Sequence, residues 1–282
     1  MVIFVINAIM KRIYIYFLFL IILASCSQQF IHKTYIPTPP TINYIKDKDF
    51  QDLKIKGNFS IFETQYTKAL NEKWGINSNL ILNSGFGINA GLVKYKHFEK
   101  SYFEILSGIG YNFRKSIIER GLGFHILIAS KYYHHNLQSE YLNYYLQPSY
   151  LFKLSKNCSF GFSINNNLVF FDKYQYMYTL ENYQGSEEQY IFEADSVNEN
   201  NILGLLIEPT ITFKFSNSGK TSFFIQLGYT FNALYNISNY YLYRSYDEIP
   251  VFHFKHPNFR PWIINFGFQI NLQKNNDNQN NQ

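Results

Sequence analysis

Two glutamates stand where a pair of carboxylates could act as general acid and general base. Glu104 lies in the stretch YFEILSGIGYNF, and Glu208 lies in LIEPTITFKF. Such a pair is one way to catalyse hydrolysis. In a narrow interior, however, an isolated buried charge costs several kcal/mol, so buried carboxylates are normally paired. We therefore expect a structural network of inward-facing polar side chains, formed by Gln65, Glu104, Gln147, Glu208, Lys214 and Gln226.

Histidines offer a second kind of chemistry, but their spacing does not match a metal site. His134 and His135 are adjacent, and His253 and His256 form a His-x-x-His pair. Neither pair has a cysteine or carboxylate at ligand spacing, so we expect ordinary loop histidines and no bound metal. A nucleophile elbow and a compact His–Ser pair are both missing, as is a Gly-rich phosphate loop before a helix. The sequence therefore predicts no catalysis and no cofactor.

The elements that must position these side chains are β-strands. In residues 221–233, Phe223, Ile225, Leu227, Tyr229 and Phe231 alternate with small or polar residues, and residues 260–272 repeat the pattern. A period of two is typical of a strand whose faces meet different environments. The pattern predicts ten strands, at 54–60, 62–69, 74–84, 100–113, 119–132, 141–154, 158–171, 202–215, 221–233 and 260–272.

The connections between these segments alternate in length. Short, turn-like connections are expected at 70–73, 114–118, 155–157 and 216–220, and longer ones at 85–99, 133–140, 172–201 and 234–259. Outer-membrane barrels combine short periplasmic turns with longer external loops in this way. A chain that starts in the periplasm needs two strands before the turn at 70–73, so we divide 54–69 into a hairpin, although a single strand is the alternative. Loops 172–201 and 234–259 carry most exposed tyrosines and acids, and are a candidate ligand surface.

Composition favours lipid over water around the apolar face. Aromatic residues make up 20% of the 282 residues and charged residues 16%, against roughly 25% charged in soluble domains. The polar face is mostly Gly, Ser, Thr, Asn and Gln, which suits a hydrogen-bonded lumen better than a hydrated surface. The net charge of +5 is scattered along the chain, so we expect no nucleic-acid binding. These features predict an all-β protein, a closed antiparallel transmembrane β-barrel of about ten strands.

The N-terminus has the pattern of an export signal. Lys11 and Arg12 precede an apolar run that ends in Leu-Ala-Ser before Cys26, and the start is either Met1 or Met10. The sequence LASC resembles a bacterial lipobox, which implies a signal peptide at 1–25 and acyl chains, diacylglycerol and palmitate, on Cys26. Residues 26–52 contain three prolines and are expected to form a tether to the barrel.

Several stretches together resemble the small outer-membrane β-barrel lipoproteins of Bacteroidetes. They are GNFSIF, QYTKALNEKWGINSNLIL, YFEILSGIGYNF, YLQPSYLF, LIEPTITFKF and FIQLGYTFN. The function of that family is largely unknown. The resemblance implies that its recurrent polar residues correspond to Gln65, Tyr66, Glu104 and Glu208.

The resulting expectation is a monomeric lipoprotein of the bacterial outer membrane, anchored by its N-terminus on the periplasmic side. The barrel spans 53–273, and the Asn-rich residues 274–282 form a disordered tail. Its partners are membrane lipid and a ligand at the external loops, and its role is structural or surface-binding. Two alternatives are an outer-membrane barrel enzyme acting on lipid or peptide, and a soluble lipocalin-like periplasmic carrier on a lipid tether.

Overall fold

The computed structural model describes Tyr35 and residues 38–58, 61–83, 85–122, 130–155, 157–184, 188–218, 221–234, 242–246, 249–253 and 262–272. All of them belong to one compact unit, Lys33–Gln282. Within these residues, no helix has the length and apolar character needed to cross a membrane.

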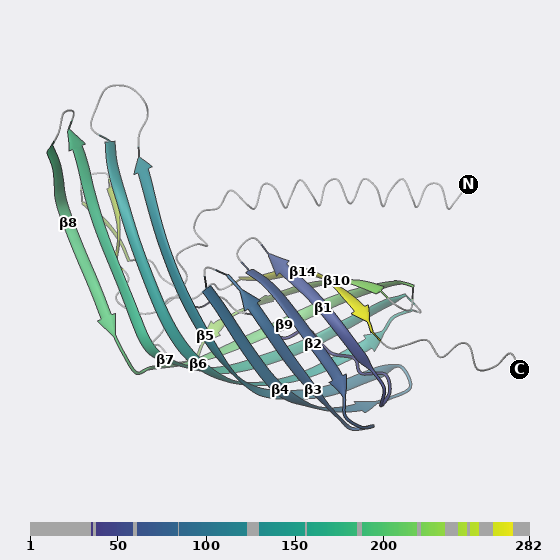
Figure 1. Ribbon diagram of the computed structural model, residues 1–282. Helices are drawn as coiled ribbons and strands as arrows, with labels where there is room; N and C mark the ends of the chain where they lie inside the picture. Colours follow the sequence, from purple (N-terminus) through teal and green to yellow (C-terminus); the bar gives the residue numbers. More distant parts are fainter. Residues whose placement is uncertain are drawn as a thin grey trace, which may run out of the picture. The chain divides into compact units, whose positions relative to one another are not determined.

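Within the described residues, ten strands close into an antiparallel ring (Figure 1). Neighbours in the ring follow the order of the chain, and β14 pairs back onto β1 from Asp52 opposite Asn271 to Gly57 opposite Phe266. The ring consists of β1 (Gln51–Asn58), β2 (Ile61–Ala69), β3 (Trp74–Leu82), β4 (Gly85–His97), β5 (Ser101–Leu122), β6 (Ser130–Lys153), β7 (Cys158–Gln184), β9 (Ile202–Ser218), β10 (Thr221–Tyr229) and β14 (Trp262–Asn271). The predicted all-β barrel of ten antiparallel strands is confirmed.

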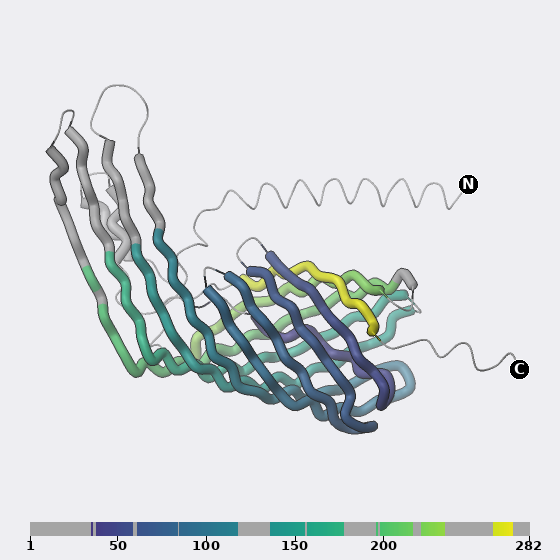
Figure 2. The backbone as a smooth tube through the Cα atoms, in the orientation of Figure 1, coloured from purple at the N-terminus to yellow at the C-terminus, as the bar shows by residue number. Residues whose placement is uncertain are grey.

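Three of these strands continue well past the ring. The β4–β5 ladder stops at Gly85 opposite Arg114, whereas the β5–β6 ladder continues to Leu122 opposite Lys131. The far part of β7 pairs with β8 (Glu188–Glu199), so β5, β6, β7 and β8 extend the sheet beyond the closed part (Figure 2). Smaller elements are β11 (Phe231–Asn232), which pairs with β9, and a separate hairpin of β12 (Leu242–Tyr246) and β13 (Ile249–His253).

Strand β4 corrects one sequence prediction. Residues 85–99 are predicted to be one of the longer connections, yet Gly85–His97 pair with β3 and β5. The glycines mark close approach rather than a turn. A side chain at Gly87 would collide with the amide of Asn112, and one at Gly91 would lie 2.9 Å from the Tyr145 hydroxyl.

The region between β5 and β6 corrects three further predictions made from the sequence. The ladder between these strands keeps one register from Ser101 opposite Phe152 to Leu122 opposite Lys131. The predicted strand at 119–132 and the predicted connections at 114–118 and 133–140 are therefore wrong, because two long strands replace them. The predicted loop 172–201 likewise contains the end of β7 and all of β8. The predicted number of ten strands is nevertheless correct, because the structure contains β4, which was not predicted, and lacks the predicted strand at 119–132.

The two faces of the barrel wall are sharply different in polarity. Many large apolar side chains lie on the outside, such as Ile109 at 66% exposure and Phe268 at 60%. Buried positions on the ring strands are largely polar, including Glu63, Gln65, Glu104, Gln147, Glu208 and Gln226, each at 0% exposure. The barrel is thus polar inside and apolar outside, the reverse of a soluble protein.

The two ends of the barrel also differ. We call one the turn end, because short connections join the strands there, at 70–73, 98–100, 154–157 and 219–220. The other is the long-strand end, where β5, β6 and β7 continue beyond the ring. At that end β1 and β2 are joined through residues 59–60, so they are two strands, as the parity argument predicts.

Candidate functional site

Tyr35 and residues 38–50 belong to the stretch that the sequence assigned to a tether, and we call them the inner segment. They run through the barrel to the turn end, where residues 46–49 are exposed. At the long-strand end, Tyr35 packs with Phe171 and Leu206. At the turn end, the carbonyl of Phe50 accepts a hydrogen bond of 2.9 Å from the N–H of Ala69. The buried residues between them are Pro39, Pro40, Thr41, Ile42, Asn43 and Ile45. The lumen is therefore filled by a piece of the same chain that precedes β1.

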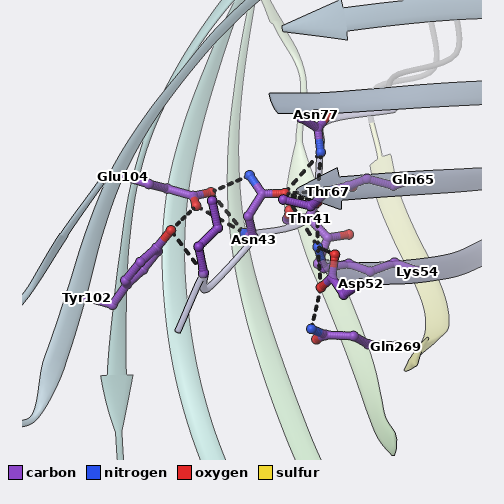
Figure 3. A network of polar contacts seen from close by, with 11 residues as sticks. Thr41, Asn43, Asp52, Lys54, Gln65, Thr67, Asn77, Tyr102, Glu104 and Gln269 are labelled. Atoms are coloured by element: carbon purple, nitrogen blue, oxygen red, sulfur yellow. Dashed lines mark hydrogen bonds and ion pairs between the residues drawn. The ribbon is translucent and has the colours of Figure 1, made fainter. Parts of the chain in front are cut away.

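Asn43 is the centre of the contacts between this segment and the wall (Figure 3). Its backbone N–H donates to both carboxylate oxygens of Glu104, at 3.0 and 3.2 Å, and its side-chain amide donates to Glu104 at 3.2 Å. The amide oxygen of Asn43 accepts from four wall side chains, which are Lys54 at 3.4 Å, Gln65 at 2.8 Å, Thr67 at 2.7 Å and Asn77 at 3.0 Å. One asparagine thus joins five wall residues.

Three wall glutamines bind the backbone of the inner segment. Gln65 accepts from the N–H of Thr41 at 3.0 Å and donates to its carbonyl at 2.9 Å. Gln226 donates to the carbonyl of Pro39 at 3.3 Å, and Gln147 donates to that of Pro40 at 2.8 Å. Because proline has no N–H, each offers only an acceptor, and a donor from the wall suffices. The prolines that suggested a tether are therefore equally suited to a lumen.

Glu208 holds the other end of the segment. Tyr35 donates to it at 2.8 Å, and Asn165 donates to its second oxygen at 2.6 Å. A phenol keeps its proton at neutral pH, so Tyr35 is the donor and the carboxylate of Glu208 is the acceptor. Glu208 therefore fastens the segment near the long-strand end.

Glycines in the wall leave space for apolar side chains of the segment. A Cβ at Gly161 would collide with the end of the Ile42 side chain, and one at Gly75 would lie 2.6 Å from the end of Ile45. Ile42 and Ile45 belong to the largest buried apolar cluster, together with Tyr95, Tyr102 and Leu106. Polar and apolar contacts therefore fix the segment at several points along the lumen.

All six residues of the predicted polar network face the interior, and each one contacts the inner segment. Lys214 does so through the ring of Tyr44, with its Nζ 5.4 Å from the ring centroid. Lys214, the lysine of the predicted network, is not the partner of either glutamate. Within the described residues the ion pairs are Lys54 with Asp52 and Lys56 with Glu63, both at 3.1 Å and fully buried, while Glu104 and Glu208 are held by neutral donors.

This arrangement leaves little room for catalysis by the two glutamates. Glu104 is occupied by Asn43 and by the Tyr102 hydroxyl at 2.8 Å, and Glu208 by Tyr35 and Asn165. Neither could transfer a proton to a substrate unless the inner segment moved away. Among the described residues there is no cluster of three or more His, Cys, Asp or Glu side chains placed to hold a metal ion.

Comparison of the chain with protein-family models, curated proteins and solved structures finds no match. The function must therefore be inferred from the fold and the site themselves.

Several predicted features lie outside the described residues. They are the signal peptide 1–25, Cys26, His256 and the tail 274–282. His134, His135 and His253 fall on β6 and β13, but their side chains are outside the description as well. The external loop 234–259 is described only at 234, 242–246 and 249–253.

The partner of the polar network is the inner segment, which was not predicted from the sequence. A signal was present, because Ile42, Ile45 and Phe50 are large apolar residues that a hydrated tether does not need. The contact itself joins Asn43 to Glu104 across 61 positions of the chain. No local pattern reports a pairing at such a separation.

Proposed function

We propose that the protein is an outer-membrane β-barrel lipoprotein, closed by its own inner segment, with a structural or surface-binding role and no catalysis. The observation that carries this proposal is the reversed polarity of the wall. An apolar exterior of this extent is unfavourable in water and favourable in a bilayer. It argues against a soluble lipocalin-like carrier, whose apolar face would line the interior.

Aromatic side chains add a second argument, because they form two belts around the exterior. Near the turn end, Tyr150 contacts Phe98, Phe103 and Phe152, and Phe223 contacts Phe268. Near the long-strand end, Phe86 contacts Tyr111 and Phe113, and Tyr229 contacts Phe231 and Trp262. Membrane barrels carry such belts at both lipid–water interfaces.

The spacing of the two belts fits a bilayer. On β5 they are marked by Phe103 and Phe113, and the outward residues between them are uncharged, namely Ile105, Ser107, Ile109 and Tyr111. Ten residues at about 3.3 Å each, on a strand tilted by about 40°, span roughly 25 Å, the height of the apolar band of outer-membrane barrels. The belts therefore lie where the two interfaces of a membrane would be.

Removing the acylation site tests whether the barrel itself holds the protein in the membrane. We expect the Cys26→Ser protein to stay in the outer-membrane fraction and to resist extraction with alkaline carbonate, because the apolar wall keeps its contact with lipid. The measurement is fractionation followed by immunoblotting, with an untagged soluble periplasmic protein as the control. Folded Cys26→Ser protein in the soluble fraction would contradict the integral barrel and favour a tethered soluble one.

The direction of the inner segment bears on the side of the anchor. Tyr35 lies at the long-strand end, and nine positions separate it from Cys26, a reach of about 30 Å at most. If the short turns face the periplasm, as is usual, the acylated residue is near the external leaflet and not on the periplasmic side, where the sequence had suggested it.

The accessibility of an inserted epitope tag can show on which side of the membrane the N-terminal anchor lies. We expect an epitope inserted after Gln29 to bind antibody on intact cells, because the inner segment leads back to the external end. An epitope inserted after Asn71, in a turn at the other end, serves as the control and should bind only after permeabilisation. The opposite pair of results would restore a periplasmic anchor.

The extension of β5, β6, β7 and β8 is the structural basis for a surface-binding role. It carries a small cavity of about 240 Å³, lined by Asn136, Gln138, Gln175, Tyr176, Met177, Ser196 and Asn198. Amides beside a tyrosine and a methionine suit adaptable polar and apolar contacts. The strands of the extension fall partly within the predicted loops, so the candidate ligand surface becomes a sheet.

A further inference from the structure

The mouth of the lumen at the turn end contains a second, differently built cavity. Its volume is about 490 Å³, within the range of small-molecule sites. The residues that line it come from the inner segment and from strands and turns on several sides of the ring, and include Tyr44, Lys46, Lys153, Ser159, Lys214 and Ser222. It opens at the opposite end from the β5–β8 extension, so it is independent of the proposed surface-binding role.

Positive charge dominates this cavity. Lys46, Lys153 and Lys214 line it, and no Asp or Glu is among its described lining residues. Asp52 of β1 is engaged by Lys54 at 3.1 Å and by the amide of Gln269, so its charge is already compensated, and Asp47, the chain neighbour of Lys46, is exposed. Ion pairs within the described part of the chain involve none of the three cavity lysines. Three positively charged lysines at the same opening of the lumen attract an anion.

Tyr44 organises two of these lysines. The Nζ atoms of Lys153 and Lys214 lie 5.3 and 5.4 Å from the centroid of its ring. A cation against an aromatic ring is favourable, but a second cation at the same ring adds repulsion between the two ammonium groups. The two contacts with the Tyr44 ring therefore do not explain why a third lysine lines the cavity. They also do not explain why its described lining residues include no carboxylate.

The backbone of Tyr44 is strained. Its φ of 47° lies in the left-handed region, where a bulky residue is an outlier. Its ring is held by edge-on contacts with Tyr102 at 5.2 Å and His97 at 6.2 Å. Strained residues that the surroundings keep in place are concentrated at binding sites. Here the strain places an aromatic ring inside the cluster of lysines.

We propose that this cavity binds a small, multiply charged soluble anion through phosphate or carboxylate oxygens. Lys46, Lys153 and Lys214 neutralise the anion, and Tyr44 and Phe50 contact its apolar part. Ser159 donates a hydrogen bond, as does one hydroxyl of the pair Ser216 and Ser222, whose oxygens are hydrogen-bonded to each other at 3.0 Å. Lysine with hydroxyl donors suits phosphate as a point charge. The lining faces the lumen and not the outer wall, which favours a soluble anion over a lipid headgroup.

Titration calorimetry on the full chain in neutral detergent tests the proposal, with pyrophosphate and citrate as probes at constant ionic strength. The double variant Lys46→Met/Lys153→Met is suitable because both side chains are exposed, so the change leaves no buried cavity. Lys94→Met is the matched control, since Lys94 makes a similar contact with the ring of Trp74, at 5.5 Å, on the outer wall.

We expect one of the two probes to bind the wild-type protein and Lys94→Met alike. In the double variant its Kd should rise by about tenfold or more, as for loss of charge-assisted contacts. Heat-resistant migration on gels verifies that each variant is folded. Failure of both probes to saturate the wild-type protein, or unchanged affinity in the folded double variant, would overturn the proposal.

Discussion

Replacing Asn43 with leucine is expected to lower the free energy of unfolding by about 3–6 kcal/mol, because each buried polar group left without a partner costs roughly 1–3 kcal/mol. The amide of Asn43 accepts from Lys54, Gln65, Thr67 and Asn77 and donates to Glu104. Leucine has a similar volume but none of these contacts. Two or three wall groups would stay unsatisfied inside the lumen.

The measurement is urea unfolding of the protein in phospholipid vesicles, followed by tryptophan fluorescence. Asn166→Leu is the matched control, because Asn166 faces outward, on the opposite side of the wall from its neighbours Asn165 and Asn167. Asn166 makes one exposed hydrogen bond, to the carbonyl of Leu146 at 3.2 Å, so the control is expected to lose at most about 1 kcal/mol. Equal stability of Asn43→Leu and wild type would show that the inner segment is not fixed through Asn43.

Introducing arginine at Leu227 is expected to lower stability by about 2–4 kcal/mol if the barrel lies in a bilayer. Leu227 pairs with Ile211 and Ile264 and is midway along the strand between Phe223 and Phe231, so it belongs to the centre of the apolar band. A charge there would have to leave water for the middle of the membrane, or thin the membrane around it.

Leu154→Arg serves as the matched control for this prediction. Leu154 directly follows β6 at the turn end and is 63% exposed, so it lies near an interface, where the same change costs about 0–1 kcal/mol. Urea unfolding in vesicles measures both variants. A soluble barrel would tolerate both arginines equally, because both side chains would reach water, and a difference below the experimental error would argue against membrane insertion.

The regular strands could be predicted from the sequence because their period of two is strong. Strands β9, β10 and β14 lie close to their predicted ranges. Their large apolar residues alternate with polar ones, so the pattern shows which side chains share a face of the strand. Strand β4 could not be found, because Gly85, Gly87 and Gly91 suggest a turn when read alone. Glycine is required at Gly87 and Gly91 because the lumen is narrow there. The side chains of Asn112 and Tyr145 occupy the space that a side chain at these positions would need.

The inward residues of the site could also be predicted, but their partners could not. Gln65, Glu104 and Glu208 are identified by a polar face in an otherwise apolar strand. What they bind depends on which segment occupies the lumen. The prolines do not identify that segment, because they are compatible with both a hydrated tether and a buried extended segment. The buried ion pairs of β1 and β2 were missed for a similar reason, because alternation in Lys54, Lys56 and Glu63 does not show which face is inside.

The pairing of β14 with β1 sets an order on assembly. The inner segment leads directly into β1, and its side chains are anchored to β2, β3, β5, β6, β7, β9 and β10. Once the ladder between the first and last strands has formed, Tyr35, Asn43 and Phe50 are enclosed by a complete ring. We therefore expect the sheet to curl around the segment while the seam between β1 and β14 is still open, because otherwise the segment would have to enter a finished ring through one of its ends. On this route the inner segment acts as a template for the barrel, and the seam is the last part to close.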